Sequence, residues 1–393
     1  MVSSKSLTLT VALLATSFST TSAFPEYLPT AQVAGRQDDA TASSSGLSDV
    51  YPEKPPGPLV SNGTKLVNDA AHPWNAPTRR GHERPMSSAQ YAGIARRESL
   101  SHFEMHSMLI STQYLPRNGV ATPVQLINAV QEGFNMENKA AIFVTYAAML
   151  ADGNLLTNTI SIGGKTKKTG PSPPAPALAG GLSQAGLGVE GDASLIRGDA
   201  AFGDNHSFNA TLFEEFKDFS NRLGGGYYNL TVAAEYRWHS IQRSIATNPN
   251  FTFVAPRCVT AYSESALIID ALVDGRSTER RLDMDAALGC PRNFYRAPQP
   301  VGGNELAAQI FMAHPTVPGR NTAGVNSYTP DPTSASIADF CGVYSNFVNR
   351  TVRELYPNPT GLLERNLILN LEYIYLGTPS AAGCEQLFPY GQL

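Results

Sequence analysis

Segments of helical periodicity, separated by proline and glycine, occupy most of the chain from residue 121 to residue 376. Over residues 121–151, apolar side chains such as Leu126, Ile127 and Val130 recur at the spacing of a helix with one buried face. Thr122-Pro123 is a good start for this helix, because proline is well tolerated at the first helical position.

The remaining predicted helices follow the same pattern, and predicted strands are few. Residues 170–188 contain too much proline and glycine for a helix or a strand and are predicted to be a loop. We find no repeat and no change of composition within residues 120–393. We therefore expect a mainly α-helical fold, with residues 55–393 in a single domain. Further helices are predicted within residues 207–226, 229–249, 257–275, 336–359 and 361–375.

The N-terminal residues are typical of a secreted protein. Residues 1–23 combine Lys5, a short apolar run and small residues ending at Ala23, which predicts a cleaved signal peptide. Residues 24–54 are polar and rich in serine and proline, so we expect a disordered leader or pro-segment. No stretch reaches the roughly 18 apolar residues that a membrane span needs, and we expect no membrane partner.

Charge and sequons agree with an extracellular glycoprotein. A net charge of −4 gives no reason to expect a nucleic-acid partner. The four cysteines can pair in an oxidising compartment, but their spacing does not say which ones do, and each could equally be a buried thiol. Asn-x-Ser/Thr sequons, the acceptors of N-linked glycans, begin at Asn62, Asn205, Asn209, Asn229, Asn250 and Asn349.

The sequence Glu190-Gly191-Asp192-Ala193-Ser194 is a candidate cation site. It places carboxylates, a backbone carbonyl and a hydroxyl on one short segment, and Mg²⁺ and Ca²⁺ prefer such oxygen ligands. The alternative is a loop that enters a helix, with Asp192 or Ser194 as the capping residue.

Arg257 and Glu264 are a candidate acid–base pair. They are seven positions apart in a predicted helix, which places both on one face. A buried glutamate held by an arginine can act as a general acid or base, and the alternative is a purely structural ion pair. The chain contains no Gly-x-Ser-x-Gly elbow, so a serine hydrolase has no support.

Many short motifs, in order along the chain, resemble those of the fungal haem-thiolate peroxidases, most closely the unspecific or aromatic peroxygenases. The resemblance covers nearly everything from Pro55 to the C-terminus, apart from about residues 77–113. The motifs are "HPW", "YLPRNGVATP", "NAVQEGFN", "EGDASLIRGDAAFGDNHSFN", "GGGYYNLTVAAE", "SIATNPNF", "TAYSE", "HPTVPGRN", "LYPNPTG" and "GCEQLFPYG".

The resemblance implies a single chloroperoxidase-like helical domain that binds haem b and uses hydrogen peroxide. It implies that Glu264 moves a proton between the peroxide oxygens, with Arg257 as its partner. It also implies a disulfide between Cys341 and Cys384. The cation, Mg²⁺ or Ca²⁺, would lie beside a haem propionate with Glu190, the Gly191 carbonyl and Ser194 as ligands. Positions that often hold pocket phenylalanines in the family are here Met136, Val189 and Leu267.

The chain departs from the family at the iron ligand. The family's Pro-Cys-Pro motif precedes "YLPRNG", whereas here no cysteine precedes residues 114–119. Cys258 lies beside Arg257 and cannot replace the ligand, and Cys290 lies on the wrong side of the motif order. The thiolate of that motif donates electron density to the iron and favours cleavage of the O–O bond.

The codons behind residues 81–113 offer an explanation. Read one base out of frame, Met86-Ser87 contains a cysteine codon when Ser87 is encoded by TCN, and codons 81–97 can encode Pro-Cys-Pro-x-Leu-Asn-Thr-Leu-Ala-Ser-His-Gly. The codons of Arg97-Glu98-Ser99 can contain an intron start and that of Gln113 an intron end. We therefore interpret residues 81–113 as an error in the gene model. The alternative is a real insertion that abolished haem binding.

These observations predict a secreted haem-thiolate peroxygenase or peroxidase that oxygenates or oxidises small aromatic or aliphatic molecules. Two alternatives stay open at this point. A chain without the axial cysteine could be a haem-free binding scaffold, and a haloperoxidase would differ only in its substrate.

Overall fold

A computed structural model describes residues 50–60, 63–73, 109–177, 179–182, 191–205, 207–279, 281–284, 293–302 and 304–393. The predicted signal peptide, most of the predicted leader, residues 81–108, Asn62, Val189, Glu190 and Cys290 lie outside these residues. Residues 45–393 belong to one compact unit. No helix in the described part of the chain is both long and apolar enough to cross a membrane.

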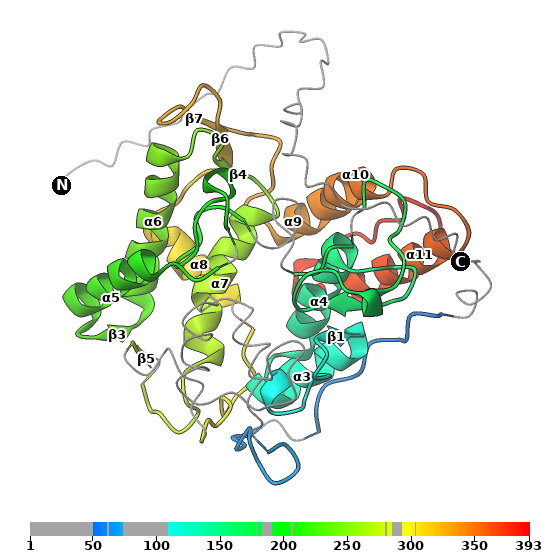
Figure 1. Cartoon of the computed structure of the whole chain (residues 1–393), viewed down its shortest axis with the longest axis horizontal. Coiled ribbons are helices and arrows are strands. Elements are labelled where there is room, and N and C mark those ends of the chain that lie inside the picture. Colours follow the sequence, from blue (N-terminus) through cyan, green and yellow to red (C-terminus); the bar gives the residue numbers. More distant parts are fainter. Residues whose placement is uncertain are drawn as a thin grey trace, which may run out of the picture. The chain divides into compact units, whose positions relative to one another are not determined.

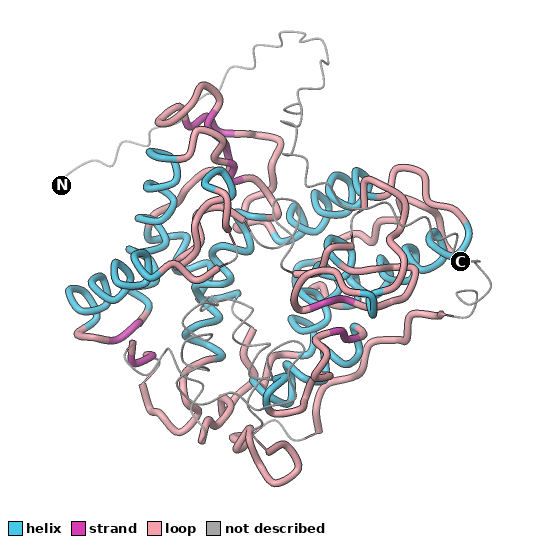
Figure 2. The backbone as a smooth tube through the Cα atoms, in the orientation of Figure 1, coloured by secondary structure: helices cyan, strands magenta, loops and turns pink. Residues whose placement is uncertain are grey.

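Helices form most of the regular secondary structure in the described residues, and strands are few and short, which confirms the predicted mainly α-helical class (Figures 1 and 2). Helix α8 was not predicted, since its ten residues carry no clear capping signal in the sequence. The α-helices are α3 (Pro123–Phe134), α4 (Asn138–Asp152), α5 (Ala210–Gly224), α6 (Leu230–Thr247), α7 (Arg257–Ala271), α8 (Asn304–Ala313), α9 (Phe340–Asn346), α10 (Arg353–Leu355) and α11 (Gly361–Leu376). A π-helical turn, Phe347–Val352, joins α9 to α10.

The ends of these helices follow from local sequence. Thr122 and Gln125 form a reciprocal capping box at the start of α3, with Pro123 in its first turn. The side chains of Asn209 and Asn229 accept hydrogen bonds from the first turns of α5 and α6. Gly225 ends α5 in the left-handed region, at φ 61°, which favours glycine.

Two hydrophobic clusters form the core, and α7 contributes to both. The first is built largely from α3, α4 and α11, and α11 packs along α4. The second is built largely from α5, α6, α7 and α8. Leu267 and Ala271 of α7 belong to the first cluster, whereas Ala261 and Ala266 belong to the second. The position of α7 is therefore fixed from two sides.

The strands are short and connect the helices. Strands β1 (Val120–Ala121) and β2 (Ile160–Ser161) pair before α3 and after α4. Strand β4 (Thr252–Phe253) pairs with β6 (Gly319–Asn321), which pairs with β7 (Tyr328–Pro330), all antiparallel. Since β4 ends four residues before Arg257, this small sheet helps to fix the start of α7. Strands β3 (Tyr227–Tyr228) and β5 (Leu282–Asp283) form a third pair.

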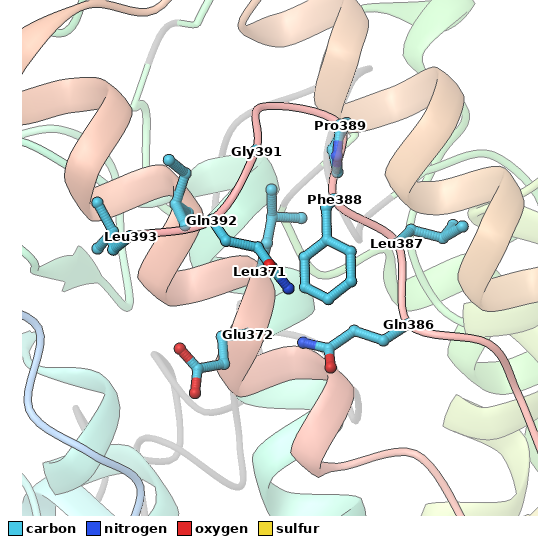
Figure 3. Close-up of a pocket in the computed structure, with 10 residues that line it drawn as sticks. Leu371, Glu372, Gln386, Leu387, Phe388, Pro389, Gly391, Gln392 and Leu393 are labelled. Atoms are coloured by element: carbon cyan, nitrogen blue, oxygen red, sulfur yellow. The ribbon is translucent and has the colours of Figure 1, made fainter.

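The C-terminal residues are held against α11. Cys341 of α9 and Cys384 form a disulfide, the pairing that the family resemblance implied. Residues 386–389 and 391–393 then line a surface pocket with Ile368, Leu371 and Glu372 of α11 (Figure 3). None of the candidate site residues lines this pocket.

We predict that replacing both Cys341 and Cys384 by serine lowers the free energy of unfolding by about 2–4 kcal/mol, because the bridge closes a long loop in the unfolded chain. Urea unfolding followed by circular dichroism measures this. Dithiothreitol should lower the stability of the unmodified chain to that of the double variant and leave the variant unchanged. Equal stability of the two proteins without reductant would contradict the prediction.

Candidate active site

Arg257 and Glu264 form a buried ion pair on α7. Arg257 Nη1 lies 2.7 Å from Glu264 Oε1, and the two residues are 6% and 5% exposed. The seven-residue spacing therefore brings the side chains together, as predicted. A charge-assisted hydrogen bond of this length is strong, and burial makes it costly to break.

The same arginine joins α7 to the loop that contains the candidate cation ligands. Arg257 Nε donates to the backbone oxygen of Asp192 at 2.7 Å. A Cβ atom on Gly191 would lie only 2.8 Å from Arg257 Cδ, so a glycine is needed where the arginine crosses the loop. Arg257 Nη2 is buried and has no hydrogen-bond partner among the described residues. The two stretches singled out in the sequence thus meet in the fold.

Two further buried arginines, which the sequence analysis did not find, lie in this region. Arg237 of α6 has its Nη2 atom 3.8 Å from Glu264 Oε2. Arg197 donates from Nε to Ser194 Oγ at 3.2 Å. Burial, together with the charges of the neighbouring arginines, lowers the pKa of each guanidinium to about 10, although Glu264 acts in the opposite direction. The sequence did hold a signal for Arg237, which is a charged residue on the apolar face of its helix.

A carboxylate pair stabilises the loop of residues 191–199. Asn248 Nδ2 donates to Asp192 Oδ2 and Asp199 Oδ2, each at 2.9 Å. Asp199 Oδ1 accepts from the amide of Ala193, and Asp192 Oδ1 from that of Ala200, where a short 3₁₀ turn begins. Asp192 thus accepts from the first amide of this turn, but the residue at its N-cap position is Asp199, so neither Asp192 nor Ser194 is the capping residue here. Burial and the charge of Asp199 raise the pKa of Asp192 to about 6.

The predicted cation ligands are only partly described. Gly191 lies against the side chain of Arg257. Ser194 is buried and its hydroxyl accepts a hydrogen bond from Arg197. Glu190 lies outside the described residues. In the described ranges, no group of three His, Cys, Asp or Glu side chains is placed to hold a metal ion.

The other sequence-predicted positions are spread over the fold. Met136 and Leu267, two of the predicted pocket positions, are both buried in the first hydrophobic cluster. Among the sequons, Asn209, Asn250 and Asn349 are exposed and Asn229 is half-buried. Asn205 is only 6% exposed, so a glycan cannot reach its side chain in this structure.

Comparison with known proteins identifies the family. An aromatic peroxygenase of Cyclocybe aegerita is 50% identical over 376 residues, which cover 94% of this chain and 95% of that protein. The chain belongs to the haem-thiolate peroxygenase family. A family model described as "Peroxidase, family 2" matches residues 108–297. An aromatic peroxygenase of Coprinellus radians is 45% identical over 278 residues, 70% of this chain and 92% of that protein.

A more distant relative is a dothistromin biosynthesis peroxidase of Dothistroma septosporum, 30% identical over 142 residues, which are 35% of this chain and 33% of that protein. The chain is therefore a peroxide-dependent oxidoreductase that acts on small organic molecules, and its family implies a haem cofactor.

The described residues fit haem only in part. The buried Arg257 Nη2 atom, which has no hydrogen-bond partner among the described residues, suits an anionic group such as the carboxylates that haem carries. No described residue suits the iron, however. Cys341 and Cys384 are joined in the disulfide. Cys258 is buried with its sulfur 3.6 Å from the Ala335 carbonyl oxygen, and burial raises the pKa of its thiol to about 12, far from the thiolate that iron needs.

We predict that Asn248→Ala lowers the free energy of unfolding by about 3–5 kcal/mol, because two buried carboxylates lose a shared donor. Chemical denaturation of unglycosylated protein measures the loss. The matched control is Asn250→Ala, whose exposed side chain predicts a change within about 0.5 kcal/mol. Similar losses in both variants would show that the carboxylate pair does not depend on Asn248.

Proposed function

We propose that this protein is a secreted peroxygenase in which Glu264 is the acid–base group and Arg257 its partner. The observation that carries the proposal is the buried pair, with 2.7 Å between Arg257 Nη1 and Glu264 Oε1. The substrates are hydrogen peroxide and small aromatic or aliphatic molecules, in keeping with relatives named aromatic peroxygenases.

Glu264 moves one proton. When bound, haem supplies the redox chemistry that divides the O–O bond of the peroxide. The ionised carboxylate of Glu264 accepts the proton of one peroxide oxygen and returns it to the other oxygen, which leaves as water. Arg257 favours the ionised form of Glu264, and its positive charge stabilises negative charge that develops on the departing oxygen.

The cation site is part of the same proposal. Glu190, the Gly191 carbonyl and Ser194 would hold Mg²⁺ or Ca²⁺ beside a carboxylate of the cofactor. Support comes from the contact between Gly191 and Arg257, which places this loop at the ion pair. Oxygen donors of this kind suit a hard cation.

The thiolate for the iron would come, in our proposal, from the Pro-Cys-Pro segment that codons 81–97 can encode in another reading frame. Residues 98–113 would then be a translated intron. The support is that no described cysteine fits the iron, whereas the described residues keep the acid–base pair. Secretion follows from the predicted signal peptide at residues 1–23, and glycans from the exposed sequons.

We predict that Glu264→Gln in the enzyme with the restored thiolate segment keeps haem binding but lowers the peroxide-driven rate about 10²- to 10⁴-fold. Arg257→Ala should also lose activity, because a buried glutamate without its partner stays protonated. The double variant should be little slower than the slower single variant, since the two residues act as a unit. Stopped-flow mixing with peroxide measures these rates.

The matched control is Glu132→Gln, which removes another carboxylate paired with a buried arginine, Arg296, at 3.3 Å. Its rate should stay within about threefold of the parent. If the losses of the two single variants multiply, Arg257 and Glu264 act independently. If Glu264→Gln unfolds the protein but leaves the rate per folded molecule normal, the pair is structural.

We predict that the chain as written binds haem weakly, whereas replacing residues 81–113 by the alternative-frame segment gives a thiolate-type Soret band in the carbon monoxide difference spectrum. Sequencing the transcript across codons 75–115 provides the direct check. A thiolate-type band from the chain as written, or a transcript that encodes residues 81–113 unchanged, would overturn the gene-model interpretation.

A further inference from the structure

Arg237 is a fully buried charge in the middle of α6, next to α7 (Figure 1). Arginine is rarely buried completely unless its charge is paired, because the interior solvates it poorly. Its position therefore calls for an explanation in terms of what it contacts.

Two of its three nitrogen atoms are anchored. Arg237 Nε donates to Ser265 Oγ on α7 at 2.9 Å, and Nη1 donates to the backbone oxygen of Ala193 at 2.5 Å. Ser265 is itself fixed, because its hydroxyl donates to the Ala261 carbonyl and its own carbonyl accepts from Tyr228. The plane of the guanidinium is thus set by α7 and by the loop of residues 191–199.

The third nitrogen atom faces the acid–base carboxylate. Arg237 Nη2 lies 3.8 Å from Glu264 Oε2, is buried and has no hydrogen-bond partner within the part of the chain that the structure describes. Arg257 contacts the other oxygen, Oε1. One guanidinium therefore lies at each oxygen of Glu264, and the carboxylate cannot rotate without losing one of them.

Other charged or titratable groups also face this region. Arg197, from the loop of residues 191–199, interacts electrostatically with Glu264 and adds positive charge. Asp192 interacts with Arg257 and offsets part of that charge. Tyr228 and Tyr262 lie near Arg237. Burial raises the pKa of each phenol, so both stay neutral and add no charge near Glu264.

We propose that Arg237 is a positioning residue that holds the second oxygen of Glu264 and keeps this carboxylate ionised and correctly oriented. The inference rests on the proton-moving role proposed for Glu264. Arg257 contacts only Oε1 and also donates to the Asp192 carbonyl, so the guanidinium of Arg237 adds a constraint on the other oxygen of Glu264.

The test is the ionisation of Glu264 itself, read from its carboxylate band in pH-dependent infrared difference spectra, with Glu264→Gln identifying the band. We expect Arg237→Gln to raise the pH at which Glu264 takes up a proton by one unit or more. Arg237→Lys, which keeps the charge, should restore most of that shift. In the haem-loaded enzyme, the acid limb of the rate profile should move by the same amount.

The matched control is Arg296→Gln, which removes an equally buried arginine bonded to the Glu132 and Gly63 carbonyls. It should lower stability without moving the Glu264 band. If Arg237→Gln does not fold, Ser265→Ala decides the question. This variant releases the guanidinium of Arg237 and should also raise the pH at which Glu264 takes up a proton. No shift in the variant that folds overturns the inference.

The two proposals fail in different ways. If Glu264→Gln keeps the normal rate, the proton-moving role is wrong whatever Arg237 does. If Glu264→Gln is slow but the Arg237 and Ser265 variants leave the ionisation of Glu264 unchanged, only the role of Arg237 is wrong.

Discussion

The ion pair between Arg257 and Glu264 is the interaction on which the arrangement of the site depends. Both residues lie on α7, which is held between two hydrophobic clusters. A pair of charges in such a position is costly unless its remaining hydrogen-bonding atoms are satisfied. Arg257 meets this requirement partly by donating to the Asp192 carbonyl, so the pair also fixes the loop that follows Gly191.

That loop is in turn fixed by a second set of buried charges. Asp192 and Asp199 both accept from Asn248, which follows the end of α6, and Asp199 also accepts from the Ala193 amide. The loop is therefore tied to α6 through Asn248 and to α7 through Arg257. Hydrogen-bonded networks of this kind are rigid because each member satisfies another. Ser194 and Gly191 are thereby held at defined positions near the acid–base pair.

The features that were predicted correctly from the sequence depend on interactions between residues that are close in the chain. The cap at Thr122 and the glycines after α5 interact only with residues a few positions away, so the start of α3 and the end of α5 could be predicted from the sequence. The Arg257–Glu264 pair was predictable for the same reason, since one helix carries both residues. Helix α8 was missed because its short sequence has no start signal and its buried residues, Ala307 and Ile310, are few.

Arg237 and Asn205 show what local reasoning cannot reach. The role of Arg237 depends on Ala193 and Ser265, which are distant in sequence and meet it only in the folded chain. A sequon likewise does not reveal whether its asparagine is accessible, and Asn205 proves to be buried. The disulfide between Cys341 and Cys384 came from family resemblance, since spacing alone left every pairing open.

The buried arginines also argue against the haem-free scaffold. Replacing buried charges by apolar residues of similar volume is often neutral or stabilising, so folding alone gives little reason to keep such a group. Here Arg197, Arg237 and Arg257 gather around the carboxylate of Glu264, and among the described residues the Nη2 atoms of Arg237 and Arg257 have no hydrogen-bond partner. Such a concentration of buried positive charge is useful where an anionic cofactor and a developing negative charge must be accommodated.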